Sequence, residues 1–321
     1  MNKEEIILKV INEKYPVQIH KVKCITNEMY RCFSRETDYY ARITNYKTYE
    51  EQLQEVKWTN YLYNHGVGAP MAILSIEGNI VETGMFPETK RIVLFKAAPG
   101  VHLPLSEWDP QVFKKLGQEI GLMHRITKDY QQEESTDRLK DWFENEEYQF
   151  LKYIPEGETT IRKIGRDIFN QVQAIPKTNN TYGLLHADIW LENVLVKDHS
   201  KITLIDFQDC EKHYYLYDLI VPIYSALEFS FSGNGNIKEY AQAITESIFE
   251  GYSMEQNIPS EMLKHFPLLF KLKEIFEYQL MHMYWDKENL SEEQIRILNH
   301  YRIRLENDFT VLNSINLHSF F

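Results

Sequence analysis

The sequence predicts an α+β protein with two lobes: a small five-stranded β lobe with one main helix, then a larger, mostly helical lobe. Segments rich in Val, Ile, Tyr and Phe are concentrated before residue 96. A Pro-Gly pair then ends the strand pattern, and apolar residues recur at helical spacing through most of the remaining chain. We therefore expect an N-terminal lobe at 1–95, an interlobe linker at 96–100 and a C-terminal lobe at 101–321.

The small lobe is expected to open with a short helix over residues 3–14, whose Ile and Val residues lie on one face. The main helix begins after Thr48, which has capping-box spacing with Glu51, and continues to about His65. Strand-like segments surround this helix. They are residues 17–25, 29–34, 38–43, 71–76, 79–85 and the run RIVLF that ends at Phe95.

The larger lobe is expected to consist mainly of helices. The first begins at Asp109-Pro110, an N-cap followed by proline at the first helical position. Pro222 is expected to kink a later helix. The further helices are predicted at about 158–173, 216–230, 237–254, 260–284 and 291–308.

Composition excludes several classes of protein. The formal net charge of −12, with no basic block, argues against nucleic-acid binding. Three cysteines at long spacings suggest neither a disulfide framework nor a zinc site. No apolar run approaches the roughly 18 residues of a membrane helix, and the charged N-terminus lacks a signal-peptide core. We expect a cytoplasmic protein without membrane or nucleic-acid partners, and the oligomeric state stays open.

One stretch carries a chemical pattern. It contains His186, Asp188 and Asn193 in the spacing H-x-D-x-x-x-x-N, with Asp206 thirteen residues after the asparagine. Two short β runs lie between Asn193 and Asp206, around a polar turn. A hairpin over 194–205 would bring Asn193 and Asp206 to the same end.

These residue types suit phosphoryl transfer. That reaction needs a carboxylate near the acceptor hydroxyl and hard oxygen ligands on a metal ion. Asp188 is expected to accept or orient the hydroxyl proton, and Asn193 and Asp206 are expected to bind Mg²⁺. An isolated H-x-D or D-F is common; the fixed step to Asn193, the flanking strands and the second aspartate together favour the functional interpretation.

The stretch HADIWLEN…LIDFQDC resembles the H-G-D-x-x-x-x-N…I-D-F-D-D pattern of the aminoglycoside phosphotransferase and choline kinase superfamily. The resemblance covers roughly residues 20–230 and includes 55–67, 93–100 and 116–127. It implies a protein-kinase-like fold and a kinase that transfers the γ-phosphoryl group of ATP, with GTP not excluded. The implied acceptor is a hydroxyl of an amino alcohol, a sugar or an aminoglycoside-type molecule.

The resemblance also implies individual roles. Asp188 would be the catalytic base, and Asn193 and Asp206 would be the Mg²⁺ ligands. His186 would support the loop structurally. Asp218 matches an aspartate that braces the catalytic loop in the family.

The sequence departs from the family pattern at three places. Ala187 replaces the usual glycine, a mild change if the backbone there stays in a permitted region. Gln208 replaces a residue that is usually acidic, which leaves any extra metal or substrate role of that position open. The turn within 24–33 has no glycine; Asn27 is expected to support it, and the amides of 28–31 to cover the phosphates.

Four more residues are expected to contact the nucleotide. Arg42 on the third strand and Glu55 on the main helix are expected to form an ion pair that holds a cation on the phosphates. The alternative is that Arg42 is a solvated strand residue. Phe95 and Ala97 lie at the linker, where the backbone is expected to bond adenine.

Other interpretations stay open. A Ser/Thr protein kinase is the runner-up, although the eleven residues between Asp206 and Asp218 are too few for a peptide platform. A non-catalytic pseudokinase or scaffold is the rival from another class, because the 24–33 turn lacks glycine. The acidic run at 133–147 is interpreted as a solvated face rather than a site for a polycationic acceptor, and Trp190 either walls the acceptor site or packs internally.

Overall fold

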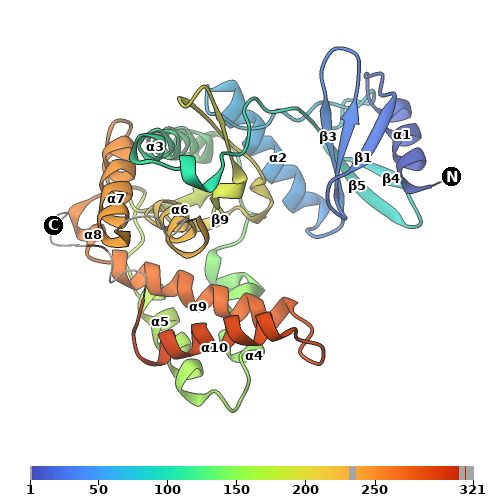
Figure 1. Ribbon diagram of the computed structural model, residues 1–321. Helices are drawn as coiled ribbons and strands as arrows, with labels where there is room; N and C mark the ends of the chain where they lie inside the picture. Colours follow the sequence, from blue (N-terminus) through green and yellow to red (C-terminus); the bar gives the residue numbers. More distant parts are fainter. Residues whose placement is uncertain (1, 231–235, 311–314, 316–321) are drawn as a thin grey trace. The chain divides into compact units, whose positions relative to one another are not determined.

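The computed structural model describes residues 2–230, 236–310 and 315 (Figure 1). The chain divides into two compact units, each assembled from several stretches of sequence. Unit 1 comprises Met1–His102, Ile126–Leu139 and Glu192–Cys210; unit 2 comprises Leu103–Arg125, Lys140–Leu191 and Glu211–Phe321. The lobe and linker bounds expected from the sequence remain predictions.

Unit 1 contains the expected five-stranded sheet, which is antiparallel with strand order β1-β2-β3-β5-β4. The strands are β1 Lys21–Cys24, β2 Met29–Phe33, β3 Tyr39–Thr44, β4 Glu82–Met85 and β5 Thr89–Lys96. The strand predicted at 71–76 does not form. β4 pairs with β5 only as far as Ile92, and beyond it Ala72 makes a single bridge to Phe95. The part of β5 that β4 leaves unpaired is short, so residues 71–76 cannot form enough hydrogen bonds with it to make a strand.

Two helices, α1 (Lys3–Lys14) and α2 (Tyr49–Asn64), pack on opposite faces of the sheet; Figure 1 shows α1 beside it. β5 alternates between them: Ile92 and Leu94 join the core cluster under α1, whereas Val93 and Phe95 pack with Val56 of α2. The capping box predicted for α2 is present, since the Glu51 N–H donates to Thr48 Oγ1 at 3.2 Å and the Thr48 N–H donates to Glu51 Oε2 at 2.8 Å.

The hairpin predicted between Asn193 and Asp206 is also part of unit 1. It consists of β7 (Val194–Lys197) and β8 (Lys201–Leu204), and the Ile205 N–H donates to the Asn193 carbonyl at 2.9 Å at its open end. Gly68 lets the hairpin approach closely. The Leu204 N–H donates to the Gly68 carbonyl at 2.8 Å, and a Cβ at 68 would lie 2.0 Å from the Ile202 carbonyl oxygen.

Unit 2 is mainly helical, and α5, α9 and α10 pack together within it (Figure 1). Its helices are α4 Phe150–Tyr153, α5 Thr159–Gln173, α6 Tyr217–Ser225, α7 Ile237–Ser253, α8 Ser260–Leu263, α9 Phe266–Tyr284 and α10 Glu292–Glu306. A two-stranded sheet joins β6 (Tyr182–Leu185) to β9 (Glu211–Tyr214). α3 (Pro110–Glu133) contributes residues to both units.

Two predicted helices differ in detail. The helix expected at 260–284 is divided into α8 and α9. Pro267 lies in the first turn of α9, where a missing N–H is tolerated. The same proline would break a helix that continued through it from α8. The helix expected at 216–230 is α6, which contains Pro222, followed by a π-helical turn at Ala226–Ser230.

Short 3₁₀ turns connect several of these elements. They are Leu105–Glu107, Trp142–Glu144, Glu146–Tyr148, Leu191–Asn193 and Phe207–Asp209. Among the described residues, no helix combines the length and apolar character needed to span a bilayer.

Candidate active site

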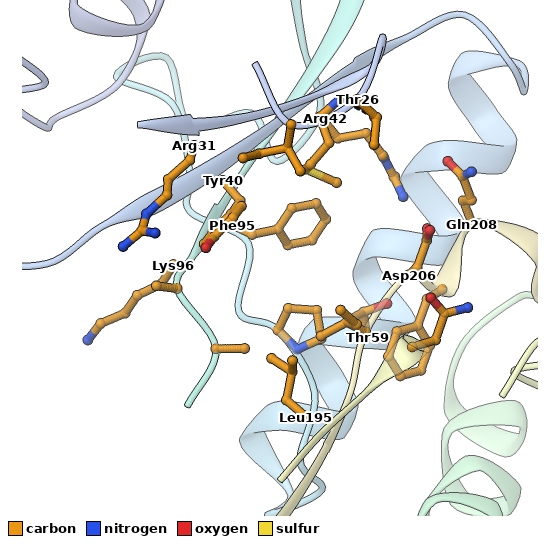
Figure 2. A pocket seen from close by; sticks show the side chains of 18 of the residues that line it. Thr26, Arg31, Tyr40, Arg42, Thr59, Phe95, Lys96, Leu195, Asp206 and Gln208 are labelled. Atoms are coloured by element: carbon orange, nitrogen blue, oxygen red, sulfur yellow. Dashed lines mark hydrogen bonds between the residues drawn. The ribbon is translucent and has the colours of Figure 1, made fainter. Parts of the chain in front are cut away.

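Unit 1 encloses a cavity of about 640 Å³, drawn in Figure 2. Its walls come from the 25–29 turn, β2, β3 and β5, from α2, from the 96–102 segment and from the end of the hairpin. Arg42, Asp206 and Gln208 lie toward one end in Figure 2, and Arg31 and Lys96 lie toward the other. The cavity therefore has one end with a guanidinium, a carboxylate and an amide side chain, and another end with Arg31 and Lys96.

Six residues predicted from the sequence to bind nucleotide or metal line this cavity: Arg42, Glu55, Phe95, Ala97, Asn193 and Asp206. Asn27 does not line it. Its carbonyl accepts from the Tyr30 hydroxyl at 2.9 Å, and its neighbours Thr26 and Glu28 contribute to the wall instead.

The expected ion pair between Arg42 and Glu55 is present and buried. Arg42 Nη1 donates to Glu55 Oε1 at 2.9 Å and Nη2 to Oε2 at 2.6 Å, so the guanidinium and carboxylate meet in parallel. The Arg42 Nε–H has no protein partner among the described residues. Burial opposes the charge on Arg42, but Glu55 and then Asp206 favour it, and the pKa of Arg42 is raised. A permanently charged donor thus remains for an anion at this end of the cavity.

The turn without glycine is stabilised by Thr26. Its Oγ1 accepts from the N–H groups of Glu28 at 3.3 Å and Met29 at 3.0 Å, and among the described residues no positive φ occurs in this turn. The Glu28 carboxylate accepts from the Thr44 hydroxyl at 2.6 Å. Because two of the amides expected to cover phosphates are used within the turn, Arg42 is the better candidate for that contact.

The linker has a spare backbone donor at Ala98, as far as the described residues show. The Lys96 N–H donates to the Met71 carbonyl at 2.8 Å, and the Ala97 N–H to the Asp38 carbonyl at 2.9 Å. The next residue, Ala98, lines the cavity, and its N–H has no hydrogen-bond partner among the described residues. A ligand at this end can therefore bond Ala98 without displacing a protein contact.

Asn193 and Asp206 flank the hairpin and offer one amide and one carboxylate oxygen to the cavity. Asp206 has φ 64° and ψ 62°, a left-handed conformation that Asp tolerates better than most residues. The described residues contain no group of three His, Cys, Asp or Glu suited to hold a metal alone. Two hard oxygen donors fit a divalent cation such as Mg²⁺ that completes its shell with water and phosphate oxygens.

The loop that follows β6 belongs to unit 2 and is tied to Asp218, which is fully buried. The N–H groups of His186 and Ala187 donate to its two carboxylate oxygens at 3.0 and 2.8 Å. The His186 ring is also buried, and its Nδ1 accepts from the Asp188 N–H at 3.3 Å. Asp218 and His186 thus make backbone contacts of the kind expected of residues that hold this loop in shape.

His124 of α3 also bonds Asp218, a link that the sequence did not reveal. Its Nε2–H donates to Asp218 Oδ2 at 2.9 Å, and its Nδ1 pairs with the Tyr252 hydroxyl at 3.1 Å. The carboxylate thus fixes the ring tautomer and joins α3 to the loop. The only sequence signal was a histidine on the apolar side of a helix, which is usual for a packed residue.

Ala187 is strained. Its φ is 69°, in the left-handed region, where a side chain costs about 1–2 kcal/mol. An alanine in place of the family's glycine would be a mild change only if the backbone at 187 stayed in a region that alanine readily adopts. The observed φ does not meet this condition, so the replacement strains the backbone.

We expect Ala187→Gly to raise the free energy of unfolding by about 0.5–1 kcal/mol, because the relief of strain exceeds the extra backbone entropy of glycine in the unfolded chain. Urea unfolding would measure this. Ala243→Gly in the middle of α7 is the control and should instead lose about 1 kcal/mol. Equal destabilisation by both changes would contradict the assignment of strain to Ala187.

Lys273 of α9 is a second residue that the sequence did not reveal. It is 1% exposed, and its Nζ lies 2.6 Å from the Glu277 carboxylate and 5.0 Å from the ring centroid of Trp190. Burial opposes its charge, but Glu277, Tyr217 and Asp188 outweigh this, and the pKa of Lys273 is raised. The available signal was a lysine on the apolar face of a predicted helix.

Several carboxylates of the acidic run at 133–147 accept hydrogen bonds from other residues of the protein. Asp137 accepts from Gln54 and Ser135, Asp141 from Lys177 and Tyr182, and Glu146 from Lys152 and Tyr153. Glu147 accepts from Tyr284. The Glu133 side chain lies outside the described residues. These contacts favour a structural interpretation of the run over a site for a polycation.

Comparisons with known proteins show the family of this chain. The profile of the phosphotransferase enzyme family matches residues 25–243, more than half of the chain. Amicoumacin kinase of Bacillus subtilis (strain 168) is 25% identical over 311 residues, which cover 95% of this chain and 92% of that protein.

Solved structures share the fold. Amicoumacin kinase hAmiN in complex with AMP-PNP, Ca²⁺ and Ami superposes with a TM-score of 0.91 at 24% identity, covering 100% of this chain and 98% of the other. A microcompartment-associated aminopropanol kinase superposes with a TM-score of 0.74 at 18% identity, covering 97% and 99%. The protein belongs to the phosphotransferase enzyme family and is a phosphotransferase that acts on a hydroxyl.

Proposed function

We propose that the protein is an ATP-dependent kinase that transfers the γ-phosphoryl group to a hydroxyl of a small molecule. The observation that carries this proposal is the cavity end where the buried Arg42 keeps its Nε–H unpaired beside Asp206. A cationic donor and a hard carboxylate oxygen next to each other suit a metal-bound phosphate chain.

The cavity supports one direction for the nucleotide. Its base would lie against Phe95 and accept a hydrogen bond from the Ala98 N–H, since the Ala97 N–H already donates to Asp38. The phosphates would extend toward Arg42, and Asn193 and Asp206 would hold Mg²⁺. When bound, this ion neutralises phosphate oxygens. A relative described in complex with AMP-PNP and Ca²⁺ supports the use of ATP with a divalent cation.

Asp188 would accept the proton of the attacking hydroxyl. Its side chain is partly exposed, as contact with a substrate requires, and its backbone is fixed through His186 and Asp218. The carboxylate needs to be ionised to take the proton, and it interacts with the buried positive charge of Lys273.

The acceptor would be an amino alcohol, a sugar or an aminoglycoside-type compound. The name of one relative, an aminopropanol kinase, supports an amino alcohol as acceptor, and that of another, an amicoumacin kinase, supports a small-molecule acceptor. A protein substrate is less suitable, because the 3₁₀ turn at Phe207–Asp209, β9 and the first residue of α6 occupy eight of the eleven residues between Asp206 and Asp218. Three free cysteines agree with a cytoplasmic location.

A coupled assay of ADP release over amino alcohols, sugars, aminoglycosides and amicoumacin tests the proposal. We expect at least one acceptor to stimulate ADP release in the presence of Mg²⁺, and chelation of the metal to abolish it. Asp206→Asn should raise the Mg²⁺ concentration needed for half-maximal rate by about tenfold or more, since it removes the charged ligand. Nucleotide binding without turnover on the whole panel would favour a pseudokinase or scaffold instead.

A further inference from the structure

Lys273 carries a buried charge in the apolar middle of α9. Its neighbours Leu272 and Ile275 are fully buried, and its ammonium lies over the rings of Trp190 and Phe276, both at 5.0 Å. The one carboxylate paired with it in α9, Glu277, follows four residues later and is 12% exposed. The pair is thus removed from water on nearly all sides.

The fold does not need a charge at this position. Removing two ions from water costs several kcal/mol each, and buried ion pairs replaced together by apolar residues of similar volume often leave stability equal or higher. In addition, a lysine four residues before a glutamate is the weaker order for a helical pair. Lys273 is therefore better explained by what it contacts than by the stability of α9.

Its contacts lead to the loop that holds Asp188. Trp190, two residues after Asp188, has the ammonium over its ring and meets Tyr224 of α6 edge-on at 6.1 Å. The next residue, Leu191, donates its N–H to Ser225 Oγ at 3.3 Å. This segment of the loop is therefore held from one side by α6 and from the other by α9.

We propose that Lys273 is a positioning residue for phosphoryl transfer, whose ammonium fixes the Trp190 ring and places a positive charge that interacts with the neighbouring Asp188 carboxylate. The inference rests on the proposed function, in which Asp188 is the base. The titratable groups that act on the ammonium are Glu277 of the same helix, Tyr217 of α6 and Asp188 itself.

The test uses Lys273→Met/Glu277→Gln, because Lys273→Met alone would leave Glu277 buried without a counter-ion and risk unfolding. We expect kcat to fall about tenfold while the KM for the nucleotide is unchanged, since the contacts of Lys273 are all within unit 2. The double variant removes the buried positive charge that interacts with the Asp188 carboxylate. The acid limb of the pH profile of kcat/KM should therefore move to higher pH by about one unit.

Two further variants complete the design. Lys273→Arg keeps a charge over the Trp190 ring and should retain kcat within about threefold of the unmodified enzyme. Lys271→Met removes a partly exposed lysine of the same helix, paired with Asp308, and should change neither kcat nor the acid limb. Urea unfolding of every variant would verify that the fold is retained.

The outcomes separate the two proposals. If the double variant keeps the kcat and the acid limb of the unmodified enzyme while Asp188→Asn is inactive, the role of Lys273 is wrong and the proposed function stands. A loss of activity in Lys273→Arg as large as in the double variant would also overturn it, because the charge would then not be the cause. If Asp188→Asn is fully active, the proposed function itself fails.

Discussion

Asp188→Asn is expected to lower kcat by about 10²-fold or more, the usual loss when a positioned general base is removed. The amide has the shape of the carboxylate but cannot accept a proton. The N–H groups of His186 and Ala187 tie the loop backbone to Asp218, and the substitution leaves these contacts in place. The loss should therefore fall on the chemical step, with the unfolding free energy and nucleotide affinity nearly unchanged.

Steady-state kinetics with an acceptor from the panel would measure this effect, with ADP binding followed by calorimetry. Asp198→Asn is the matched control: it makes the same chemical change at an exposed turn of the hairpin, where φ is 52° and asparagine is tolerated. It should retain full activity. A kcat of Asp188→Asn close to that of the control would refute the role of Asp188 as base.

Glu55→Gln is expected to lower the free energy of unfolding by about 3 kcal/mol or more. The guanidinium of Arg42 would stay buried opposite a neutral amide, and loss of one partner of a buried pair typically costs about 3–5 kcal/mol. Urea unfolding measures this change. Glu13→Gln breaks an exposed pair with Lys9 and should cost less than about 0.5 kcal/mol.

The double variant Arg42→Met/Glu55→Leu separates stability from binding. Both positions are buried, so apolar replacements should restore the unfolding free energy to within about 1 kcal/mol of the original. The affinity for ADP should nevertheless stay at least about tenfold weaker, because the donor proposed for the phosphates is gone. Full recovery of ADP affinity in the stable double variant would show that Arg42 does not contact the nucleotide.

Elements encoded by neighbouring residues were predictable from the sequence. The bounds of α1 and the capping box of α2 follow from apolar spacing and from the Thr48–Glu51 pair, which act within one or two turns. The hairpin between Asn193 and Asp206 was predictable for the same reason, since two short β runs flank a polar turn. The strand expected at 71–76 failed because strand formation depends on a free partner edge, which no local pattern specifies.

The contacts that His124 and Lys273 make around the loop were not predictable, because they join residues far apart in sequence. His124 and Asp218 are 94 residues apart, and Lys273 reaches Trp190 from a helix without a recognisable motif. The backbone donor at the linker was not predictable either. The Ala97 N–H is already bonded to the carbonyl of Asp38, which lies on another segment, and this leaves the Ala98 N–H for a ligand. The Arg42–Glu55 pair could be predicted from the sequence, whereas the partners of His124, Lys273 and the linker amides required the packed structure.

The tie between the loop and Asp218 has a consequence for the energetics of catalysis. A carboxylate without solvent contact receives two backbone amides and one imidazole, so the loop takes its shape when the protein folds. The cost of ordering the loop is therefore met during folding rather than at each turnover. Such a loop behaves as a rigid template rather than a closing lid, and little reorganisation energy remains to be supplied when a substrate binds.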